Sequence, residues 1–129
     1  MIDRQTVADL APPPGYAHVS SAPPGRLILT AGAVPVDADG QLVGGGDLTA
    51  QARQTIVNLM RALEVAGATG DDVLKTTVYV VAATAADLTT VWKVVQDSPI
   101  AAAASTLLGI ALLGYDGQLV EIEAIAVVP

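Results

Sequence analysis

The sequence contains no cysteine and no phenylalanine, and it has a single histidine and a single tryptophan. Without cysteine there is no disulfide, no thiolate nucleophile and no cysteine-ligated metal, and one histidine cannot build a multi-histidine metal site. We therefore expect no metal and no other cofactor. Because aromatic residues are only 3% of the chain, the core must consist mainly of valine, leucine, isoleucine and alanine.

Positive charge is also scarce, with six Lys and Arg residues against thirteen Asp and Glu residues and a formal net charge of −7. Such a surface repels phosphate backbones, and no basic cluster interrupts it, so we expect no nucleic-acid partner. The chain lacks an apolar run of about 20 residues, the length that spans a bilayer, and its start has no signal-peptide pattern. We expect a cytoplasmic protein with no membrane partner.

Apolar residues, by contrast, make up 52% of the 129 residues, whereas charged residues make up 15%. A chain of this length suits one domain, and its apolar fraction exceeds what a small monomer needs for its interior. Some apolar surface is therefore expected to close against other subunits. Residues 1–15, which end in a Pro-Pro-Pro-Gly run, are predicted to form an N-terminal arm, and residues 16–129 a single domain.

Hydrophobic periodicity predicts two helices separated by β-prone runs. The first helix lies between Asp47, a candidate N-cap, and Gly67, a candidate C′ glycine, and its apolar residues recur at three- and four-residue steps. The second covers about residues 85–97. The predicted strands, of which the first two are expected to form a hairpin, cover residues 16–21, 26–33, 76–81, 105–112 and 118–127. The order ββ-α-β-α-ββ predicts an α+β fold with two helices on one face of a sheet.

The last predicted strand has two different faces. Glu121 and Glu123 point to one side, together with Leu119 and Ile125, because side chains alternate along a strand. The residues between them are all apolar and belong under the helices. The two glutamates therefore face solvent, a subunit interface or a pocket.

Five sequence blocks between residues 15 and 127 together resemble the RidA/YjgF family of reactive-intermediate deaminases. They are GYAH at 15–18, TAGAVP at 30–35, AQARQ with NL at 50–59, VLKTTVY at 73–79 and VEIEAIA at 120–126. The resemblance implies a chorismate-mutase-like fold of about six strands and two helices, assembled as a homotrimer with small-molecule clefts between subunits. It also implies, for the typical member, hydrolysis of enamine and imine intermediates such as 2-aminoacrylate to the 2-keto acid and ammonia.

The resemblance also implies site residues. Glu121 matches a glutamate beside the catalytic water, Gly32 matches a glycine whose backbone faces the cleft, and Tyr16 matches an aromatic residue near the entrance. The typical member binds the substrate carboxylate with an arginine near the start of the penultimate strand. That position is Ser105 here, or Thr106 if the following loop differs by one residue, and both are candidate substrate-binding residues.

The missing arginine has a chemical consequence. No basic residue follows Lys93, and the hydroxyls of Ser105 and Thr106 each donate one neutral hydrogen bond, whereas an arginine forms two charge-assisted hydrogen bonds with a carboxylate. Glu121 would add repulsion to an anionic imino acid. We therefore expect weak or no standard deaminase activity. An older label for the family, endoribonuclease, gains no support from the acidic charge.

Two other residues, His18 and Trp92, have side chains that could belong to a functional site. His18 is the only base that a Ser-His-Asp triad could use, but no GxSxG motif occurs, so we interpret it as a surface or hairpin residue. Trp92 stands where the family frequently has an asparagine on its second helix. Because it shares the helical spacing of Leu88, Val91 and Val95, core packing is the simpler interpretation.

Three functions remain open at this point. In the first, the cleft handles a neutral or differently charged small molecule, by water addition or hydrolysis that uses Glu121. In the second, the protein is a non-catalytic ligand-binding or scaffold trimer. In the third, it is an ordinary imine deaminase that works without the arginine. The sequence names no substrate and leaves open whether a neighbouring subunit supplies a cation.

Overall fold

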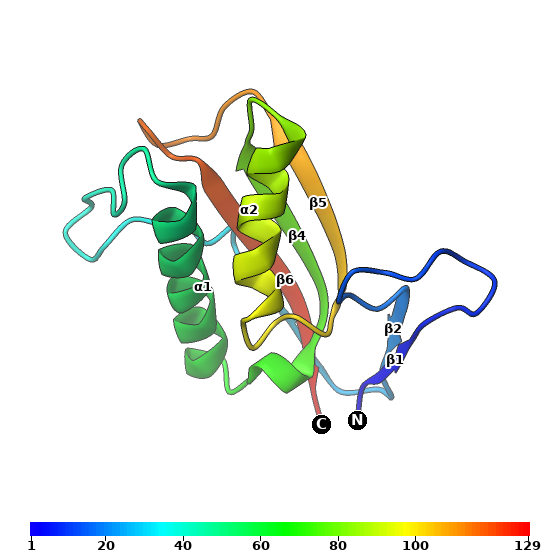
Figure 1. Cartoon of the computed structure of the whole chain (residues 1–129). Coiled ribbons are helices and arrows are strands. Elements are labelled where there is room, and N and C mark those ends of the chain that lie inside the picture. The colour runs from blue at the N-terminus through cyan, green and yellow to red at the C-terminus, as the bar shows by residue number, and fades with distance from the viewer.

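The computed structural model describes all residues 1–129 and places two helices on one face of a four-stranded sheet, with a two-stranded sheet beside it (Figure 1). The helices are α1 (Leu48–Val65) and α2 (Ala85–Gln96), with a short 3-10 helix, η1, at Gly70–Asp72. The strands are β1 (Asp3–Gln5), β2 (Val19–Ser21), β3 (Arg26–Leu29), β4 (Val73–Val81), β5 (Ala104–Ile110) and β6 (Val120–Val128). The predicted α+β class with two helices on one sheet is confirmed.

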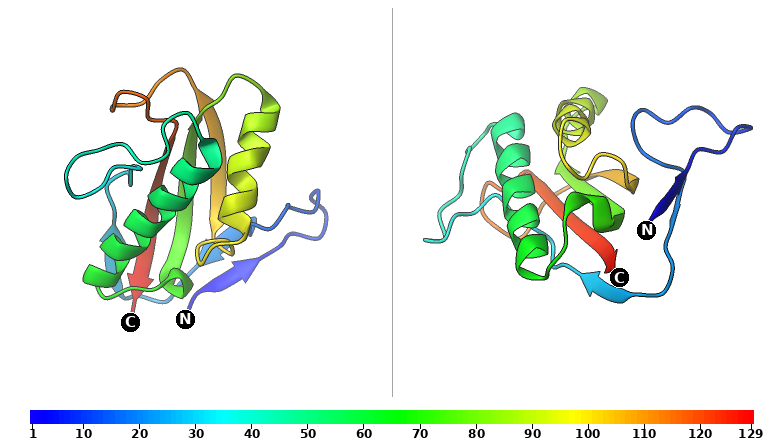
Figure 2. Two further views of the ribbon diagram at one scale, coloured as in Figure 1. Left: turned by 60° about the vertical axis from the view of Figure 1, so that its left-hand side comes forward. Right: turned by 90° about the horizontal axis from the view of Figure 1, so that it is seen from below.

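The main sheet has the strand order β3-β6-β4-β5. Strand β6 is antiparallel to both β3 and β4, while β5 is parallel to β4. A parallel pair needs a crossover connection, and here α2 provides it between β4 and β5. Both helices lie on the same side of this sheet, and the two views of Figure 2 show that its other side carries no helix.

The structure corrects the predicted pairing of the first strands. The sequence predicted a hairpin between residues 16–21 and 26–33, but β2 pairs with β1, and β3 pairs with β6. Between β2 and β3 lie Pro23 and Pro24, which lack the amide hydrogen that a strand ladder needs. The chain therefore leaves one sheet and enters the other at this point, and six strands are divided between two sheets rather than forming one.

Both helices begin at side-chain caps. Oδ1 of Asp47 accepts a hydrogen bond from the Ala50 amide at 3.0 Å at the start of α1, and the Asp87 carboxylate accepts one from the Thr84 amide at 3.3 Å at the start of α2. Gly67 follows α1 with φ of +84°, a left-handed conformation that glycine adopts without strain. The predicted limits of α1 are confirmed. Neither helix is both long enough and apolar enough to cross a membrane.

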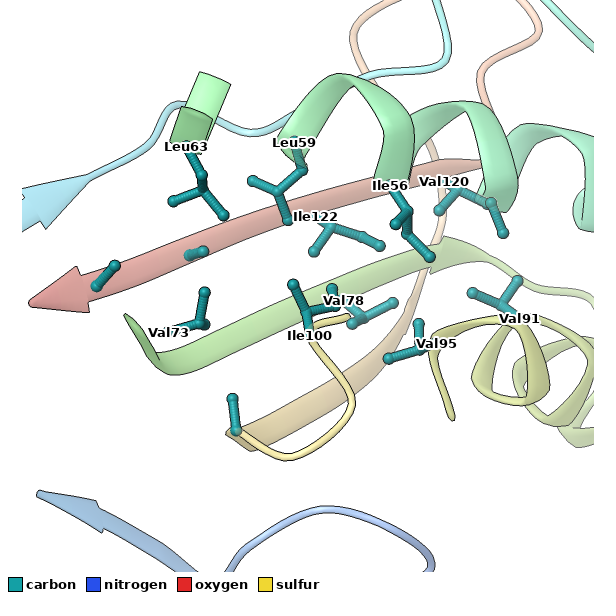
Figure 3. Close-up of a cluster of buried hydrophobic side chains, with 14 of the residues drawn as sticks. Ile56, Leu59, Leu63, Val73, Val78, Val91, Val95, Ile100, Val120 and Ile122 are labelled. Atoms are coloured by element: carbon teal, nitrogen blue, oxygen red, sulfur yellow. The ribbon is translucent and has the colours of Figure 1, made fainter. Parts of the chain in front are cut away.

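The hydrophobic core fills the layer between the helices and the main sheet (Figure 3). Val120, Ile122, Ala124 and Ala126 of β6 are all buried there, as the alternation of this strand predicted. The largest fully buried apolar partners from the rest of the chain are Leu59, Leu63, Val73, Val78, Val80, Val91, Val95 and Ile100. Burying a leucine or isoleucine contributes roughly 1.5–3 kcal/mol, so this layer fixes the sheet against both helices.

The face of the main sheet away from the helices is open in the single chain. It carries exposed apolar side chains at Leu27, Leu29, Leu108 and Ile125. Glu121 and Glu123 stand on this same face because they alternate with the buried residues of β6. An apolar area of this kind on a sheet face is typical of a contact between subunits.

Candidate functional site

The candidate residues lie in two groups within one chain. Tyr16 and Ser105 lie together beside α2, on the helix side of the main sheet. Thr106 and Glu121 lie on its open face, where Glu121 contacts Gly32. No single pocket of one chain therefore contains all five residues.

A cavity of about 250 Å³ opens between α2, β5 and the segment before β2. It is lined by Pro14, Tyr16, Trp92, Ser105 and Leu107. The rings of Tyr16 and Trp92 meet edge to face with their centroids 5.9 Å apart, a favourable geometry for aromatic pairs. None of the five lining side chains carries a charge.

Hydrogen bonds from α2 hold the segment that closes this cavity. The Trp92 indole donates to the Pro14 carbonyl at 2.7 Å, and Nε2 of Gln96 donates to the same oxygen at 2.7 Å. Trp92 is only 8% exposed, which confirms the predicted core packing. Its ring also forms one wall of the cavity, a role that the helical spacing could not reveal. The one available signal was its match to an asparagine position of the family.

His18 holds the same N-terminal segment from its other end. Its Nδ1 accepts a hydrogen bond from the Val7 amide at 2.9 Å, and its Nε2 lies 3.1 Å from the Ala11 carbonyl. An Nδ1 that accepts has no hydrogen of its own, so in this tautomer the ring hydrogen is on Nε2, which donates to the Ala11 carbonyl. The ring of His18 also packs against Tyr16, with centroids 6.2 Å apart. His18 therefore orders the chain next to the cavity.

Ser105 and Thr106 point to opposite sides of β5, since neighbouring side chains alternate along a strand. Ser105 faces the helix side, where the Thr76 hydroxyl donates to its Oγ at 2.8 Å. Thr106 faces the open side, where Nζ of Lys75 donates to its Oγ1 at 2.6 Å. A hydroxyl that accepts one hydrogen bond can still donate another, so Ser105 retains a donor for a molecule in the cavity.

Glu121 is half-buried and its carboxylate is held from two directions. Its Oε1 accepts a hydrogen bond from Nε2 of Gln118 at 3.0 Å. On the other side, a Cβ atom at Gly32 would overlap Oε2 of Glu121. With a larger residue at position 32 the Glu121 carboxylate would have to move, so the structure brings these two candidate residues into contact.

Tyr79 and Glu123 form a hydrogen-bonded pair beside Glu121. The Tyr79 hydroxyl donates to Oε1 of Glu123, and Tyr79 stands directly opposite Glu121 in the β4–β6 register. The hydrogen bond to Glu123 raises the pKa of Tyr79 above its ordinary value of 10.0, and desolvation and the negative charges of Glu123 and Glu121 raise it further. The sequence of β4 gives no sign of this role for Tyr79, because only the register of β4 against β6 places it here.

We expect the Glu123→Gln variant to lower the pKa of Tyr79 toward its ordinary value. Ionised Tyr79 would be an anion next to two carboxylates, so the folded state holds this proton more tightly than the unfolded state does. The resulting stability is present below a pH of about 10 and is lost as the pH rises through the raised pKa. Ultraviolet difference absorbance measures the titration, and the Tyr79→Phe variant identifies its signal. An ordinary Tyr79 titration in the wild type would contradict the hydrogen bond.

The match to a family model covers nearly the whole chain, whereas the matches to curated relatives cover about half of it. The family model described as Endoribonuclease L-PSP matches residues 8–128. A RutC family protein of Haemophilus influenzae is 42% identical over 64 residues, which are 49% of this chain and 48% of that protein. A 2-iminobutanoate/2-iminopropanoate deaminase of Salmonella typhimurium is 38% identical over 63 residues, with the same shares of the two chains. The chain thus aligns with about half the length of these curated relatives.

A solved structure resembles this fold from end to end. The crystal structure of YyfB from Yersinia pestis, a protein of unknown function of the conserved Rid family, is 34% identical. It superposes with a TM-score of 0.92 and covers 98% of this chain and 98% of its own. The similarity in sequence and the similarity in fold therefore point to the same relatives.

Proposed function

Since this chain belongs to the RidA/YjgF family, whose model is described as Endoribonuclease L-PSP, we propose that it acts on an uncharged small molecule in clefts between the subunits of a homotrimer. The reaction proposed is water addition or hydrolysis, with Glu121 positioning the water. On this proposal the protein lacks the standard 2-imino acid deaminase activity, because the position of the carboxylate-binding arginine is Ser105 or Thr106.

One observation carries the proposal: the cavity beside β5 contains Ser105 and no charged side chain. A substrate carboxylate that entered it would lose its hydration and gain at most one neutral hydrogen bond from Ser105. An uncharged molecule has no such cost, and the walls formed by Tyr16, Trp92 and Leu107 favour its apolar parts. The absence of a basic residue after Lys93 supports the same conclusion.

The separation of the two residue groups supports a site that two subunits share. Glu121 and Gly32 lie on the open sheet face, among exposed apolar side chains that a neighbouring subunit would cover. In the proposed trimer, one subunit provides the cavity with Tyr16 and Ser105, and the next provides Glu121 and Gly32. Light scattering of the purified protein gives its mass in solution, and a monomer would contradict this arrangement.

We expect the wild-type protein to leave the hydrolysis of 2-aminoacrylate and 2-iminobutanoate unaccelerated. Both imino acids are generated enzymatically in the assay, and ammonia release is measured beside the Glu121→Ala variant. The same protein should accelerate the hydrolysis of neutral imines that lack the carboxylate, and Glu121→Ala should abolish that acceleration. Strong acceleration with the imino acids, lost in Glu121→Ala, would mean that the arginine is dispensable and that the protein is an ordinary imine deaminase.

A non-catalytic ligand-binding or scaffold trimer is the second candidate, and the setting of Glu121 favours it. This carboxylate already accepts a hydrogen bond from Gln118, and Gly32 lies against its other oxygen. A carboxylate engaged in this way has less capacity to hold a water for attack. Neutral ligands that bind without turnover, with equal affinity in the wild type and in Glu121→Gln, would favour this function.

A further inference from the structure

Two of the six cationic side chains of this protein have no partner within it. Four are engaged with backbone carbonyls, a carboxylate or a hydroxyl, namely Arg4, Arg26, Arg61 and Lys75. Arg53 of α1 and Lys93 of α2 form neither a hydrogen bond nor an ion pair. The chain has a net charge of −7, so two unpaired positive side chains give this part of its surface a charge opposite to that of the whole.

Both free cations line one surface groove, of about 500 Å³, between α1 and α2. These helices lie side by side on the sheet (Figure 1). Thr49 and Ser98 add hydroxyl groups to the lining, and Asp97 adds one carboxylate. Although Asp97 follows Lys93 by one helical turn, the two do not form an ion pair, so the ammonium group remains free for a ligand.

The groove continues as a more apolar hollow of about 540 Å³ along α1. The two hollows share Ile56, Val57 and Pro99, and the second adds Met60 and Ala68. Val57, at their junction, is 59% exposed. Arg61 and Glu64 stand at the margin of the second hollow and neutralise each other at 2.8 Å.

The groove therefore has a cationic end and an apolar end. From Thr49 to Glu64 it follows α1 for about 22 Å, at the helical rise of 1.5 Å per residue. A small inorganic anion would use only the first end, and an uncharged hydrocarbon only the second. A ligand with both features would contact the cationic end and the adjoining apolar part together.

We propose that this groove binds an amphipathic anion, a medium-chain carboxylate in its simplest form. The carboxylate lies between Arg53 and Lys93, where the guanidinium can donate two parallel hydrogen bonds. The alkyl chain lies over Val57 and Met60 and removes their side chains from water. This site is separate from the cavity beside β5 and does not depend on the function proposed for it.

Calorimetric titration with octanoate, acetate and 1-octanol tests the proposal. Octanoate should bind to one site per chain. Its affinity should be at least about tenfold higher than that of acetate or 1-octanol, because only octanoate combines a carboxylate with a long alkyl chain. Arg53→Gln and Lys93→Gln should each weaken octanoate binding about fivefold, as expected for a partly exposed ion pair. Gln41→Glu, at an exposed position outside the groove, changes the net charge by the same amount and should leave the affinity unchanged.

Two results would overturn the proposal. The first is octanoate binding that is no tighter than binding of acetate or 1-octanol. The second is tight octanoate binding that persists when Arg53→Gln and Lys93→Gln are combined, which would place the ligand elsewhere. Amide chemical shifts of the wild type locate the ligand independently, and we expect changes at residues 49–57 and 93–98. Circular dichroism confirms that the variants are folded.

Discussion

The Ser105→Arg variant is expected to hydrolyse 2-iminobutanoate at least about tenfold faster than the wild type. The new guanidinium would enter the cavity that Tyr16 and Trp92 line and could form two charge-assisted hydrogen bonds with the substrate carboxylate. Hydrogen bonds to charged groups are worth about 1.5–3 kcal/mol, which is roughly a 10- to 100-fold effect. Release of ammonia and of the 2-keto acid measures the rate. Combining the change with Trp92→Asn gives the arginine more room.

The Thr106→Arg variant is the matched control for this experiment. It adds the same charge one residue further along β5, but on the opposite side of the sheet, next to the ammonium group of Lys75. We expect no gain of deaminase activity from it. A gain in Thr106→Arg without one in Ser105→Arg would show that the site lies on the open face. No gain in either variant would remove the cavity as an imino acid site.

Local signals made the helices and the last strand predictable. The N-cap at Asp47 and the glycine at position 67 depend on residues within one turn of the helix, and both are found as predicted. The two faces of β6 follow from strict alternation, which one strand displays without any partner. The order of the predicted elements indicated the α+β class, and the resemblance to a family, whose five blocks keep their order along the chain, implied the more specific chorismate-mutase-like fold.

The pairing of β2 and β3 was not predictable in the same way. They are neighbours in sequence, and a hairpin is the usual result for two strands separated by a short turn. Their actual partners are β1, at the N-terminus, and β6, about 100 residues along the chain from β3. Such long-range pairing depends on the whole sheet, whereas a short β-prone run contains information only about itself.

The geometry of the candidate site needed the strand register. Sequence alone left Ser105 and Thr106 as alternatives, and only the pairing of Ser105 with Thr76 shows which of them faces the helices. The register of β4 against β6 likewise brings Tyr79 beside Glu121. The sequence of β4 does not predict this contact, because the partner of each residue is fixed by hydrogen bonds between strands that are distant in the chain.

The largest loss of stability among these variants is expected for Gln51→Leu. Gln51 is fully buried in α1, and its side chain satisfies three backbone groups. Its Nε2 donates to the carbonyls of Gly44 and Gly117 at 3.2 and 3.0 Å, and its Oε1 accepts from the Leu119 amide at 2.7 Å. Leucine makes none of these bonds, and each buried polar group left unpaired costs about 1–3 kcal/mol. Urea unfolding should show a loss of about 3 kcal/mol or more.

The same change should also disturb the carboxylate of Glu121 before the protein unfolds. Gln118, which donates to Glu121, lies between the two residues that Gln51 holds, so releasing that turn frees the Glu121 side chain. Activity or ligand binding that depends on Glu121 should therefore fall under conditions where Gln51→Leu is still folded. Arg61→Gln, which breaks the exposed ion pair with Glu64, should change stability by no more than about 0.5 kcal/mol and leave the site intact. Equal stability of the two variants would mean that the turn before β6 is held by other contacts.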